Sequence, residues 1–530
     1  MATKFVFVTG GVVSSLGKGI ITASLGRLLA ARGFKVSLQK IEPYYNVDPS
    51  LLSPLQHGES FITDDGVAAD LDLGHFERFT DVHLTCESSV TTGKIHKLVM
   101  ERELRGEYKG GTVQVVPHVT NEIKQAIWTA AQNSNADIAL VEIGGTVGDM
   151  ESAPFLEAIR QMRWDLNDQD SCFIHVTLLP YISVAGELKT KPTQHSVKNL
   201  RSIGIAPDVI VCRTEKRITS ESREKIALFC DVKASHVVQY ADVPTLYEAP
   251  LMMEEEGFAS IVCEQLGLNH PVCDLSAWKD MVERSRNPVH KAKIALIGKY
   301  VTLKEAYVSV EEALRHAGIA LSAAVTIDWI NAEAVTYENA ADKLRGYDGI
   351  IVPGGFGDRG AEGIIAAAGY ARVNKVPYLA IGLGMQLSVV EACRSLLALS
   401  AANSQEVDPN ASVPVVYIPE NRKTANGTRS TARMGAGSVV LRDGLIRSLY
   451  ESGMVRERHG NRYEVDAKYV QALLEKGFVM TGASEPEGYP EAFEVMDHPF
   501  YAAVLYHPEF LSRPGSAHPL FMGFIRAAIK

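Results

Sequence analysis

Apolar and polar residues follow a strand, helix, strand order over the first 40 positions. The run Phe5 to Val8 is aromatic and β-branched, which is typical of a buried strand. From Ile20 to Ala31 apolar residues recur at helical spacing and predict a helix, and Lys35 to Gln39 predicts the next strand. Two strands joined through a helix form a parallel unit, so we predict an α/β fold with a P-loop-like, doubly wound parallel sheet.

The loop between the first strand and the first helix has the composition of a phosphate-binding loop. Residues Gly11 to Lys18 are similar to the pattern G-x-x-x-x-G-K, with five residues in place of four between the glycines; in that pattern backbone amides and a lysine neutralise phosphate charge. Gly19 stands where Ser or Thr usually contacts magnesium, so carboxylates from elsewhere would have to bind the metal. A glycine turn that only joins a strand to a helix is the alternative interpretation.

Two acidic stretches could supply these carboxylates. Asp70 and Asp72 lie on one side of the chain if it is extended there, and Glu142 lies in a predicted buried strand. Magnesium prefers a few hard oxygens together with phosphate oxygens and water, so we expect Asp72 and Glu142 to hold it. Either residue alone could instead cap a loop or face solvent.

Cations mark two further places where an anion could bind. Lys40 is predicted just past the carboxyl end of the second strand, where doubly wound sheets place their ligands. The stretch 187–196 gathers lysines, hydroxyls and an amide before a helix, which suits a second polyanion, and Lys225 in the helical segment 223–229 could add a charge. Solvated surface lysines are the alternative at each place.

Six motifs in the first half together resemble the synthetase domain of the CTP synthase family. They are GGVVSSLGKG, PYYNVDP…SPLQHGE, LDLGHFERF, TVQVVPH, VEIGGTVGDMES and KTKPTQHSVK, and the resemblance extends from residue 2 to about 266. It implies an ATP-dependent C–N ligase that phosphorylates the O4 of UTP and lets ammonia displace the phosphate to give CTP, with Mg²⁺ as cofactor. Such a transfer needs positioning and charge neutralisation, and no side-chain nucleophile.

The same resemblance implies roles for particular residues. Lys18 and Lys40 would contact the ATP phosphates during catalysis, and Asp72 and Glu142 would bind magnesium. The implied ATP site consists of Ser15, Leu16, Gly17, Lys18, Gly19, Ile20 and Asp72. The implied UTP or CTP site consists of Ser14, Gly148, Asp149, Glu151, Lys189, Thr190, Lys191, Gln194 and Lys225.

The second half starts a new α/β pattern after a polar, proline-containing stretch. We place a linker at 267–291, between a domain at 1–266 and a domain at 292–530. Strands at 349–357 and 376–381 with a helix at 362–373 precede a closing His-Pro-Glu motif. This half resembles a class I glutamine amidotransferase domain over residues 293–528.

The nucleophilic cysteine of that family is absent here. Gly382 stands at the centre of the expected G-x-C-x-G turn, and Cys393 lies about three helical turns later, too far to replace it. The expected base His507 and its orienting carboxylate Glu509 are therefore vestigial, because they have no thiol to activate. We predict that glutaminase activity is absent. The implied remnants of a glutamine site are Gly354, Gly355, Gly382, Gln386, Glu406 and Arg433.

Other positions also depart from the family pattern. Ala380 and Leu505 differ near the missing cysteine, which favours a natural loss of activity over a single engineered change. In the first half the family usually has Asp at Glu42, Gly-Thr-Met at 50–52, Val at position 60 and Glu at position 68. We expect these differences to lie near the nucleotide sites. They leave open a paralogue that aminates a different acceptor, or a non-catalytic partner that co-assembles with an active enzyme, although the complete phosphate loop argues against the latter.

Composition and charge limit the classes of partner. A net charge of −10 over 530 residues argues against nonspecific nucleic-acid binding, and no apolar run reaches 18 residues. We therefore expect small-molecule substrates (ATP, UTP or a related acceptor, and ammonia), no nucleic acid, no membrane, and a cytoplasmic location. The seven cysteines include no C-x-x-C pair, so neither a zinc site nor a disulfide framework is indicated. The family resemblance implies a homotetramer.

Overall fold

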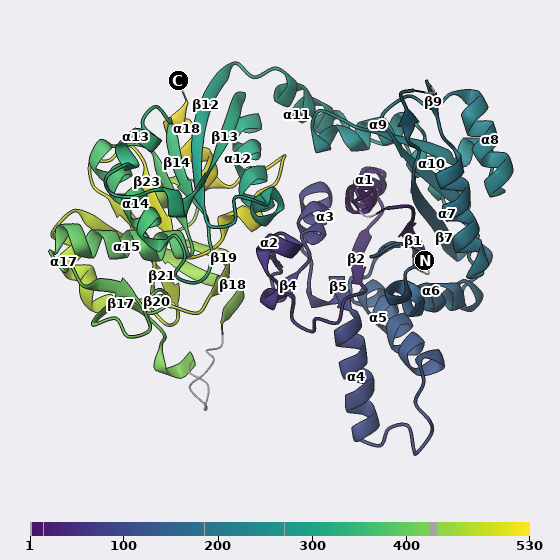
Figure 1. The fold of residues 1–530 in the computed structure, drawn as a ribbon, viewed down its shortest axis with the longest axis horizontal. Coiled ribbons are helices and arrows are strands. Elements are labelled where there is room, and N and C mark those ends of the chain that lie inside the picture. Colours follow the sequence, from purple (N-terminus) through teal and green to yellow (C-terminus); the bar gives the residue numbers. More distant parts are fainter. Residues whose placement is uncertain (1–2, 14, 185, 270, 423–431, 530) are drawn as a thin grey trace. The chain divides into compact units, whose positions relative to one another are not determined.

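The computed structural model describes residues 3–13, 15–184, 186–269, 271–422 and 432–529 (Figure 1). The chain folds into two compact units. The first comprises the residues up to Pro49 together with Asp72–Lys279, and the second comprises Ser50–Leu71 together with Asp280–Lys530. The segment Ser50–Leu71, although embedded in the first half of the sequence, therefore packs as part of the second unit.

A parallel, doubly wound sheet forms the centre of the first unit, as the sequence pattern predicts. Its strand order is β11-β10-β7-β1-β6-β2-β5, and every pairing between neighbours is parallel. The strands are β1 (Lys4–Gly10), β2 (Val36–Glu42), β5 (Ser89–Thr91), β6 (Ile138–Ile143), β7 (Ser171–Leu178), β10 (Val209–Thr214) and β11 (Val237–Ala241).

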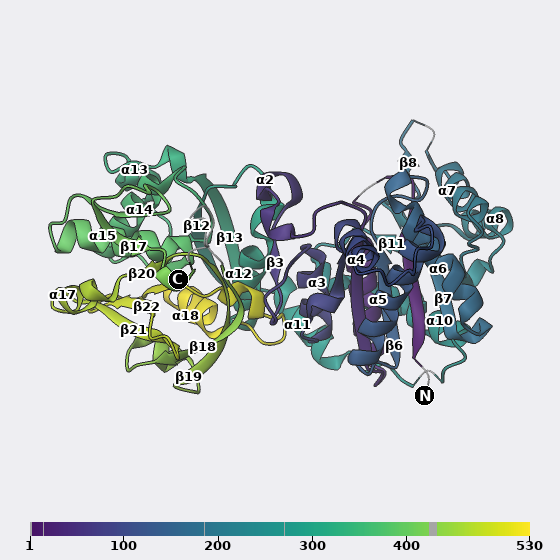
Figure 2. The ribbon, with the colours of Figure 1, turned by 90° about the horizontal axis from the view of Figure 1, so that it is seen from below.

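Helices cover both faces of this sheet (Figures 1 and 2). One face packs against α4 (Thr92–Leu104), α5 (Thr120–Asn133) and α6 (Ala153–Asp165) through a continuous apolar core. The other face carries α1 (Lys18–Ala30), α3 (Asp72–Thr80), α9 (Ala249–Glu255) and α10 (Phe258–Gln265). Towards the β11 edge, α7 (Lys191–Ser202) and α8 (Ser220–Cys230) share a smaller core with β10 and β11. Helix α11 (Ser276–Arg286) follows α10 in the chain.

Two local predictions in this unit are wrong. Lys40 does not follow its strand, because β2 continues to Glu42. Asp70 and Asp72 do not lie along an extended chain, because Asp72 is the first residue of helix α3. In both cases the local pattern places the end of an element incorrectly, and pairing with neighbouring strands or packing of a helix decides it.

The second unit is built on a mixed sheet with the strand order β13-β12-β14-β15-β23-β22-β21-β18-β19. The half from β13 to β23 is parallel, and the remaining pairings are antiparallel. Its strands are β12 (His290–Gly298), β13 (Ala323–Asn331), β14 (Gly349–Val352), β15 (Tyr378–Ile381), β18 (Arg433–Leu441), β19 (Met454–Asn461), β21 (Phe478–Glu485), β22 (Pro490–Val495) and β23 (Tyr501–Val504).

Helices also cover both faces of this second sheet. Helices α14 (Ala361–Asn374) and α15 (Leu383–Leu396) pack on one face, and α12 (Val308–Ala320) and α18 (Pro519–Ala528) on the other. The shorter elements of the two units are α2 (Pro54–His57), β3 (Phe61–Ile62), β4 (Ala68–Ala69), β8 (Tyr181–Ile182), β9 (Glu187–Leu188), α13 (Ala340–Leu344), β16 (Ala402–Ser404), β17 (Val413–Tyr417), α16 (Leu445–Leu449), β20 (Glu464–Val465) and α17 (Val470–Leu474).

Specific polar contacts hold the segment Ser50–Leu71 in the second unit. The Glu59 carboxylate accepts hydrogen bonds from the Ser309 amide at 3.2 Å and from its hydroxyl at 2.5 Å, at the start of α12. The fully buried Arg458 guanidinium pairs with Asp64 at 2.6 Å. These long-range partners explain why the segment leaves the unit to which its sequence position would assign it.

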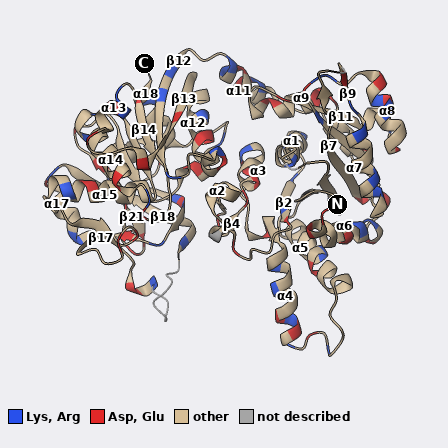
Figure 3. Ribbon diagram, in the orientation of Figure 1, with Lys and Arg blue, Asp and Glu red and all other residues tan. Residues whose placement is uncertain are grey.

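Charged side chains of both signs are interspersed on the exposed helices. Helix α4, for example, carries Lys94, Lys97 and Arg102 together with Glu101 and Glu103 (Figure 3). Such mixing is typical of a solvated helix. Within the described ranges, the helices are all too short or too polar to cross a membrane.

Candidate functional site

The predicted phosphate loop connects β1 to α1 at the carboxyl edge of the first sheet. Gly17 has a left-handed backbone, with φ of 84°, and directly precedes the first residue of α1, Lys18. The Lys18 ammonium donates to the Gly145 carbonyl at 2.7 Å, in the glycine loop that follows β6. Burial lowers the pKa of Lys18, although nearby carboxylates oppose the shift. The structure thus brings the two glycine loops of the sequence together around one lysine.

Gly19 has a steric role that the sequence pattern leaves unexplained. A Cβ at this position would lie 2.0 Å from the Asp72 Oδ1, so only glycine lets the Asp72 carboxylate approach the first turn of α1. The residue that departs from the usual Ser or Thr is therefore the one that makes room for a candidate metal ligand.

Carboxylates surround Lys40 next to this loop. Its Nζ lies 2.5 Å from the Asp72 Oδ2, 2.6 Å from the Glu142 Oε1 and 3.2 Å from the Glu42 Oε1. Lys40 and Glu142 are register partners on β2 and β6, which explains why residues 102 positions apart meet. The predicted metal ligands Asp72 and Glu142 are thus neighbours.

Burial and charge act in opposite directions on these carboxylates. Burial raises the pKa of the fully buried Glu142 to about 7, although Lys40 and Lys18 favour its ionised form. Burial also opposes ionisation of Asp72, but the attraction of Lys40 and His75 outweighs it and lowers the Asp72 pKa. One Glu142 oxygen, Oε2, is buried without a hydrogen-bond partner among the described residues. Such an oxygen suits a cation or a donor that is bound during function.

The oxygens present fit a magnesium ion that shares its coordination with a substrate. Over the described ranges, no three His, Cys, Asp or Glu side chains are grouped so that they could hold a metal by themselves. Asp72 and Glu142 supply two carboxylates, and magnesium usually completes its octahedron with phosphate oxygens and water.

The residues predicted for a second polyanion gather around α7 and α8. Lys189 pairs with Glu187, and this hydrogen bond lowers the Glu187 pKa, with a further contribution from Lys225. Gly148 lies in the loop after β6. A Cβ added to Gly148 would lie 3.9 Å from the side-chain amide of Asn199 on α7, so this loop lies beside α7. Asp149 follows in the same loop, and Glu151 lies in the short 3-10 helix Met150–Ser152. Thr190 directly precedes α7, and Lys191 and Gln194 lie at its start. Ser14 lies outside the described residues.

Two residues beside the phosphate loop were not predicted from the sequence. Arg213, near the end of β10, donates to the Leu16 carbonyl at 3.3 Å, and its guanidinium lies 5.6 Å from the centre of the Tyr240 ring. Both side chains lie close to Gly17. The sequence signal that could have identified Arg213 is an arginine near the end of a mostly apolar strand. Such a position places the side chain at the carboxyl edge of the sheet.

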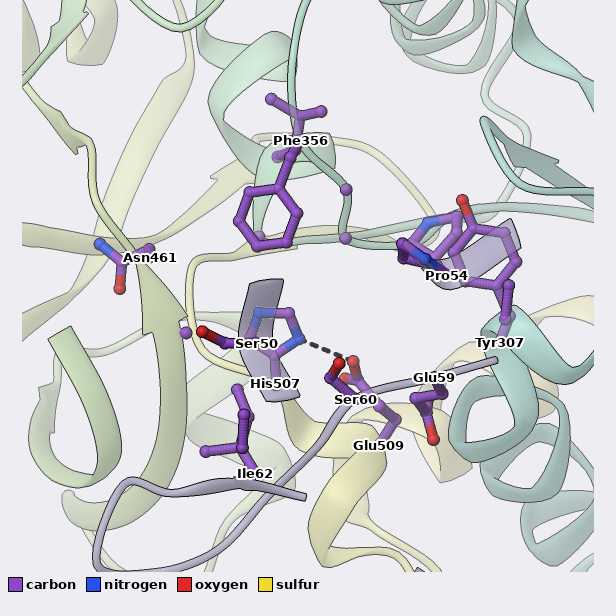
Figure 4. A pocket seen from close by; sticks show the side chains of 18 of the residues that line it. Ser50, Pro54, Glu59, Ser60, Ile62, Tyr307, Phe356, Asn461, His507 and Glu509 are labelled. Carbon is purple, nitrogen blue, oxygen red and sulfur yellow. Dashed lines mark hydrogen bonds and ion pairs between the residues drawn. The ribbon is translucent and has the colours of Figure 1, made fainter. Parts of the chain in front are cut away.

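A separate cavity of about 150 Å³ lies within the second unit (Figure 4). His507 and Glu509 lie in its wall and are hydrogen-bonded at 2.7 Å. Burial disfavours the His507 cation, but Glu509 more than compensates, so the His507 pKa is raised. Gly382 lies between β15 and α15 with φ of 56°, and a Cβ there would lie 3.2 Å from the His507 Nε2. The predicted turn, base and orienting carboxylate are therefore together, and no side chain extends from the nucleophile position.

Most of the predicted glutamine-site remnants also line this cavity. Gly354, Gly355, Gln386 and Glu406 are among its lining residues. Arg433 is not, because its guanidinium pairs with Glu491 and contacts His459 at 3.0 Å. Arg462 does line the cavity, and no periodic or motif signal in the sequence had indicated it.

The expectation about the first-half departures needs correction. Ser50, Leu52, Ser60 and Ala68 line the cavity of the second unit, whereas Glu42 lies 3.2 Å from the Lys40 ammonium beside the phosphate loop. The physical reason is the packing of segment Ser50–Leu71 into the second unit. These differences therefore surround the site that lost its cysteine.

Two family models match the two halves of the chain. Residues 4–268 match the family model "CTP synthase N-terminus", and residues 302–527 match "Glutamine amidotransferase class-I". A CTP synthase of Halalkalibacterium halodurans is 52% identical over 531 residues, covering 100% of both chains. The chain belongs to the CTP synthase family.

Further relatives cover the whole chain or its second half. A CTP synthase of Geobacillus kaustophilus is 53% identical over 529 residues, again covering 100% of both chains. Among solved structures, the Trypanosoma brucei CTPS glutaminase domain with bound acivicin is 35% identical, with a TM-score of 0.43, and the match covers 45% of this chain and 93% of that one. The predicted family and the two-part α/β fold are confirmed.

Proposed function

We propose that this member of the CTP synthase family makes CTP from UTP, ATP and free ammonia, and that it does not hydrolyse glutamine. One observation carries the proposal: the lysine and carboxylate cluster beside the phosphate loop is complete, whereas the amidotransferase cavity has glycine where a nucleophile is needed. Membership of the family over the full length supports ATP-dependent amination as the reaction.

In this proposal the first unit neutralises and positions phosphate groups. Lys18 and Lys40 contact the ATP phosphates, and Asp72 and Glu142 hold magnesium, which supplies further charge neutralisation when it is bound. The uracil O4 takes the γ-phosphoryl group, and ADP leaves. Ammonia then adds at C4, loses a proton and expels phosphate, so that the C4–O4 bond is replaced by a C4–N bond.

The UTP triphosphate is proposed to bind where α7 and α8 present their cations. Lys189, Lys191 and Lys225 carry the charge, and Gln194 is held by its hydrogen bond to the Thr190 hydroxyl at 3.0 Å. Arg213 and Tyr240 are added to the proposed ATP site, because they lie beside Gly17 and offer a flat cation and ring to a base.

Free ammonia is the proposed nitrogen donor because the second unit has no thiol at its catalytic turn. Cys393 is buried in α15, and burial raises its pKa to about 12, so it does not supply a thiolate at neutral pH. His507 and Glu509 retain a base and its orienting group but lack the atom that would attack an amide. The cytoplasmic location and the homotetramer remain predictions from the family resemblance.

Formation of CTP by the purified chain tests this proposal. With ATP, Mg²⁺, UTP and ammonium, CTP should accumulate together with ADP and phosphate. Lys18→Ala should abolish the product, whereas the matched Lys97→Ala change, at a half-exposed lysine on α4, should leave it intact. ATP turnover without CTP would instead favour amination of another acceptor, and absence of both activities would favour a non-catalytic partner.

A further inference from the structure

The ion pairs around Lys40 are built into the sheet of the first unit. Lys40 and Glu142 are opposite one another on parallel strands, and Glu42 lies two residues further along β2, on the same side as Lys40. Lys40 is 6% exposed and Glu142 is fully buried. The position of the ammonium is therefore fixed by strand register, unlike that of a surface lysine that pairs by chance.

The Lys40 ammonium occupies the place where a divalent cation would have to bind. It touches the Asp72 Oδ2 at 2.5 Å and the Glu142 Oε1 at 2.6 Å, which are oxygens of the two proposed magnesium ligands. Buried carboxylates this close to one another repel and need a positive charge between them. Lys40 supplies that charge.

We propose that Lys40 acts as an internal cation that keeps the metal site closed until nucleotide phosphates arrive. This inference rests on the proposed function in one respect, because it takes Asp72 and Glu142 as the metal ligands. A divalent ion that enters alone must break the Lys40 contacts with Asp72 and Glu142, and it then lies beside the ammonium, which repels it. A metal–nucleotide complex brings phosphate oxygens that accept hydrogen bonds from the Lys40 ammonium, while Asp72 and Glu142 coordinate the metal.

Binding of the metal and of the nucleotide is consequently cooperative. The metal and the nucleotide together compensate for breaking the contacts between Lys40 and the two carboxylates, which neither ligand does alone. By linkage, each therefore strengthens the binding of the other by the same factor. Lys40 is thus a positioning residue for the metal as well as a phosphate contact, and it prevents the carboxylates from capturing a divalent ion unproductively.

Lys18 offers a matched comparison in the same site. Its ammonium donates to the Gly145 carbonyl, and among the described residues it forms no ion pair within 4.0 Å with Asp72, Glu142 or Glu42. Removing the Lys18 charge should therefore leave the metal site closed, whereas removing the Lys40 charge should open it.

Binding of Mn²⁺ to the full chain tests the inference, with free Mn²⁺ followed by electron paramagnetic resonance and no nucleotide, UTP or ammonium present. We expect Lys40→Met to bind Mn²⁺ at least tenfold more tightly than the wild type, and Lys18→Met to bind as weakly as the wild type. Adding Asp72→Asn to Lys40→Met should remove the gained site. Mn²⁺ should also raise the melting temperature of Lys40→Met and not that of the wild type.

Wild-type measurements decide the question even if Lys40→Met does not fold. Wild-type chain should bind Mn²⁺ at an Asp72-dependent site only when a non-hydrolysable ATP analogue is present. Equally tight Asp72-dependent binding without the analogue would overturn the inference, as would a folded Lys40→Met chain that gains no affinity. Failure to form CTP with nucleotide-dependent Mn²⁺ binding intact would overturn the proposed function and support the internal-cation inference.

Discussion

Replacing Gly382 by alanine tests whether the catalytic turn has survived the loss of its cysteine. Gly382 has φ of 56° and ψ of −115°. Residues other than glycine adopt this backbone conformation only with a strain of about 1 to 3 kcal/mol. A Cβ would meet the His507 ring at 3.2 Å, which that side chain can relieve by a small shift. One kcal/mol lowers the melting temperature of a domain of this size by roughly 2 to 4 °C.

Thermal unfolding of the full chain should therefore show the second unit melting about 2 to 12 °C lower in Gly382→Ala than in the wild type. The Gly382→Cys chain carries the same backbone strain and should melt at a similar temperature. An alanine variant as stable as the wild type would refute the assigned turn geometry, because relaxed backbone at this position carries no penalty for a methyl group.

The cysteine variant adds a chemical readout that alanine lacks. The raised pKa of His507 favours an imidazolium next to the new sulfur, and such a cation stabilises a thiolate. Iodoacetamide at pH 7 should thus alkylate Gly382→Cys faster than the exposed Cys86 of the wild type, as followed by peptide mass spectrometry. Labelling no faster than at Cys86 would contradict the proposed arrangement of the base and the vacant nucleophile position.

Three further changes probe other parts of the molecule. Gly19→Ala should lower ATP affinity at least tenfold in a binding titration, because the new methyl group would collide with the Asp72 carboxylate; unchanged affinity would contradict the assigned role of Gly19. Burial lowers the pKa of His175 to about 3, so the folded state resists protonation and the free energy of unfolding falls as the pH drops below about 6.5. Between pH 7 and pH 5, His175→Gln should therefore lose about 2 kcal/mol less free energy of unfolding than the wild type. Equal losses in the two chains would refute this. Asp64→Ala removes the carboxylate that contacts the buried Arg458 at 2.6 Å and should destabilise the second unit by about 2 to 3 kcal/mol in denaturant unfolding. A loss below about 0.5 kcal/mol would argue against the pairing.

The sequence predicts the elements that depend on neighbouring residues. The strand, loop and helix around Lys18 and the glycine at position 382 could be placed because periodicity and glycine spacing act over short distances. The meeting of Lys40 with Glu142 could be expected only as a shared sheet edge, because the register of two strands about 100 residues apart is set by the whole sheet.

The membership of segment Ser50–Leu71 in the second unit could not be predicted in this way. Its partners, Ser309 and Arg458, lie roughly 250 and 390 residues away in the chain, and no local pattern signals such a pairing. For the same reason Arg462 was missed in the cavity, and the pairing of Arg433 with Glu491 was not foreseen.

Isotope tracing tests the central claim most directly. The chain is supplied with ATP, Mg²⁺, UTP, unlabelled ammonium and glutamine labelled with ¹⁵N in its amide, and the exocyclic nitrogen of CTP is analysed by mass spectrometry. The account predicts CTP that contains only ammonium nitrogen, with no glutamate released. Labelled CTP formed at the same rate as glutamate would contradict the account. The nitrogen would then come from the glutamine amide, which the account says this chain does not hydrolyse because it has no nucleophile at position 382.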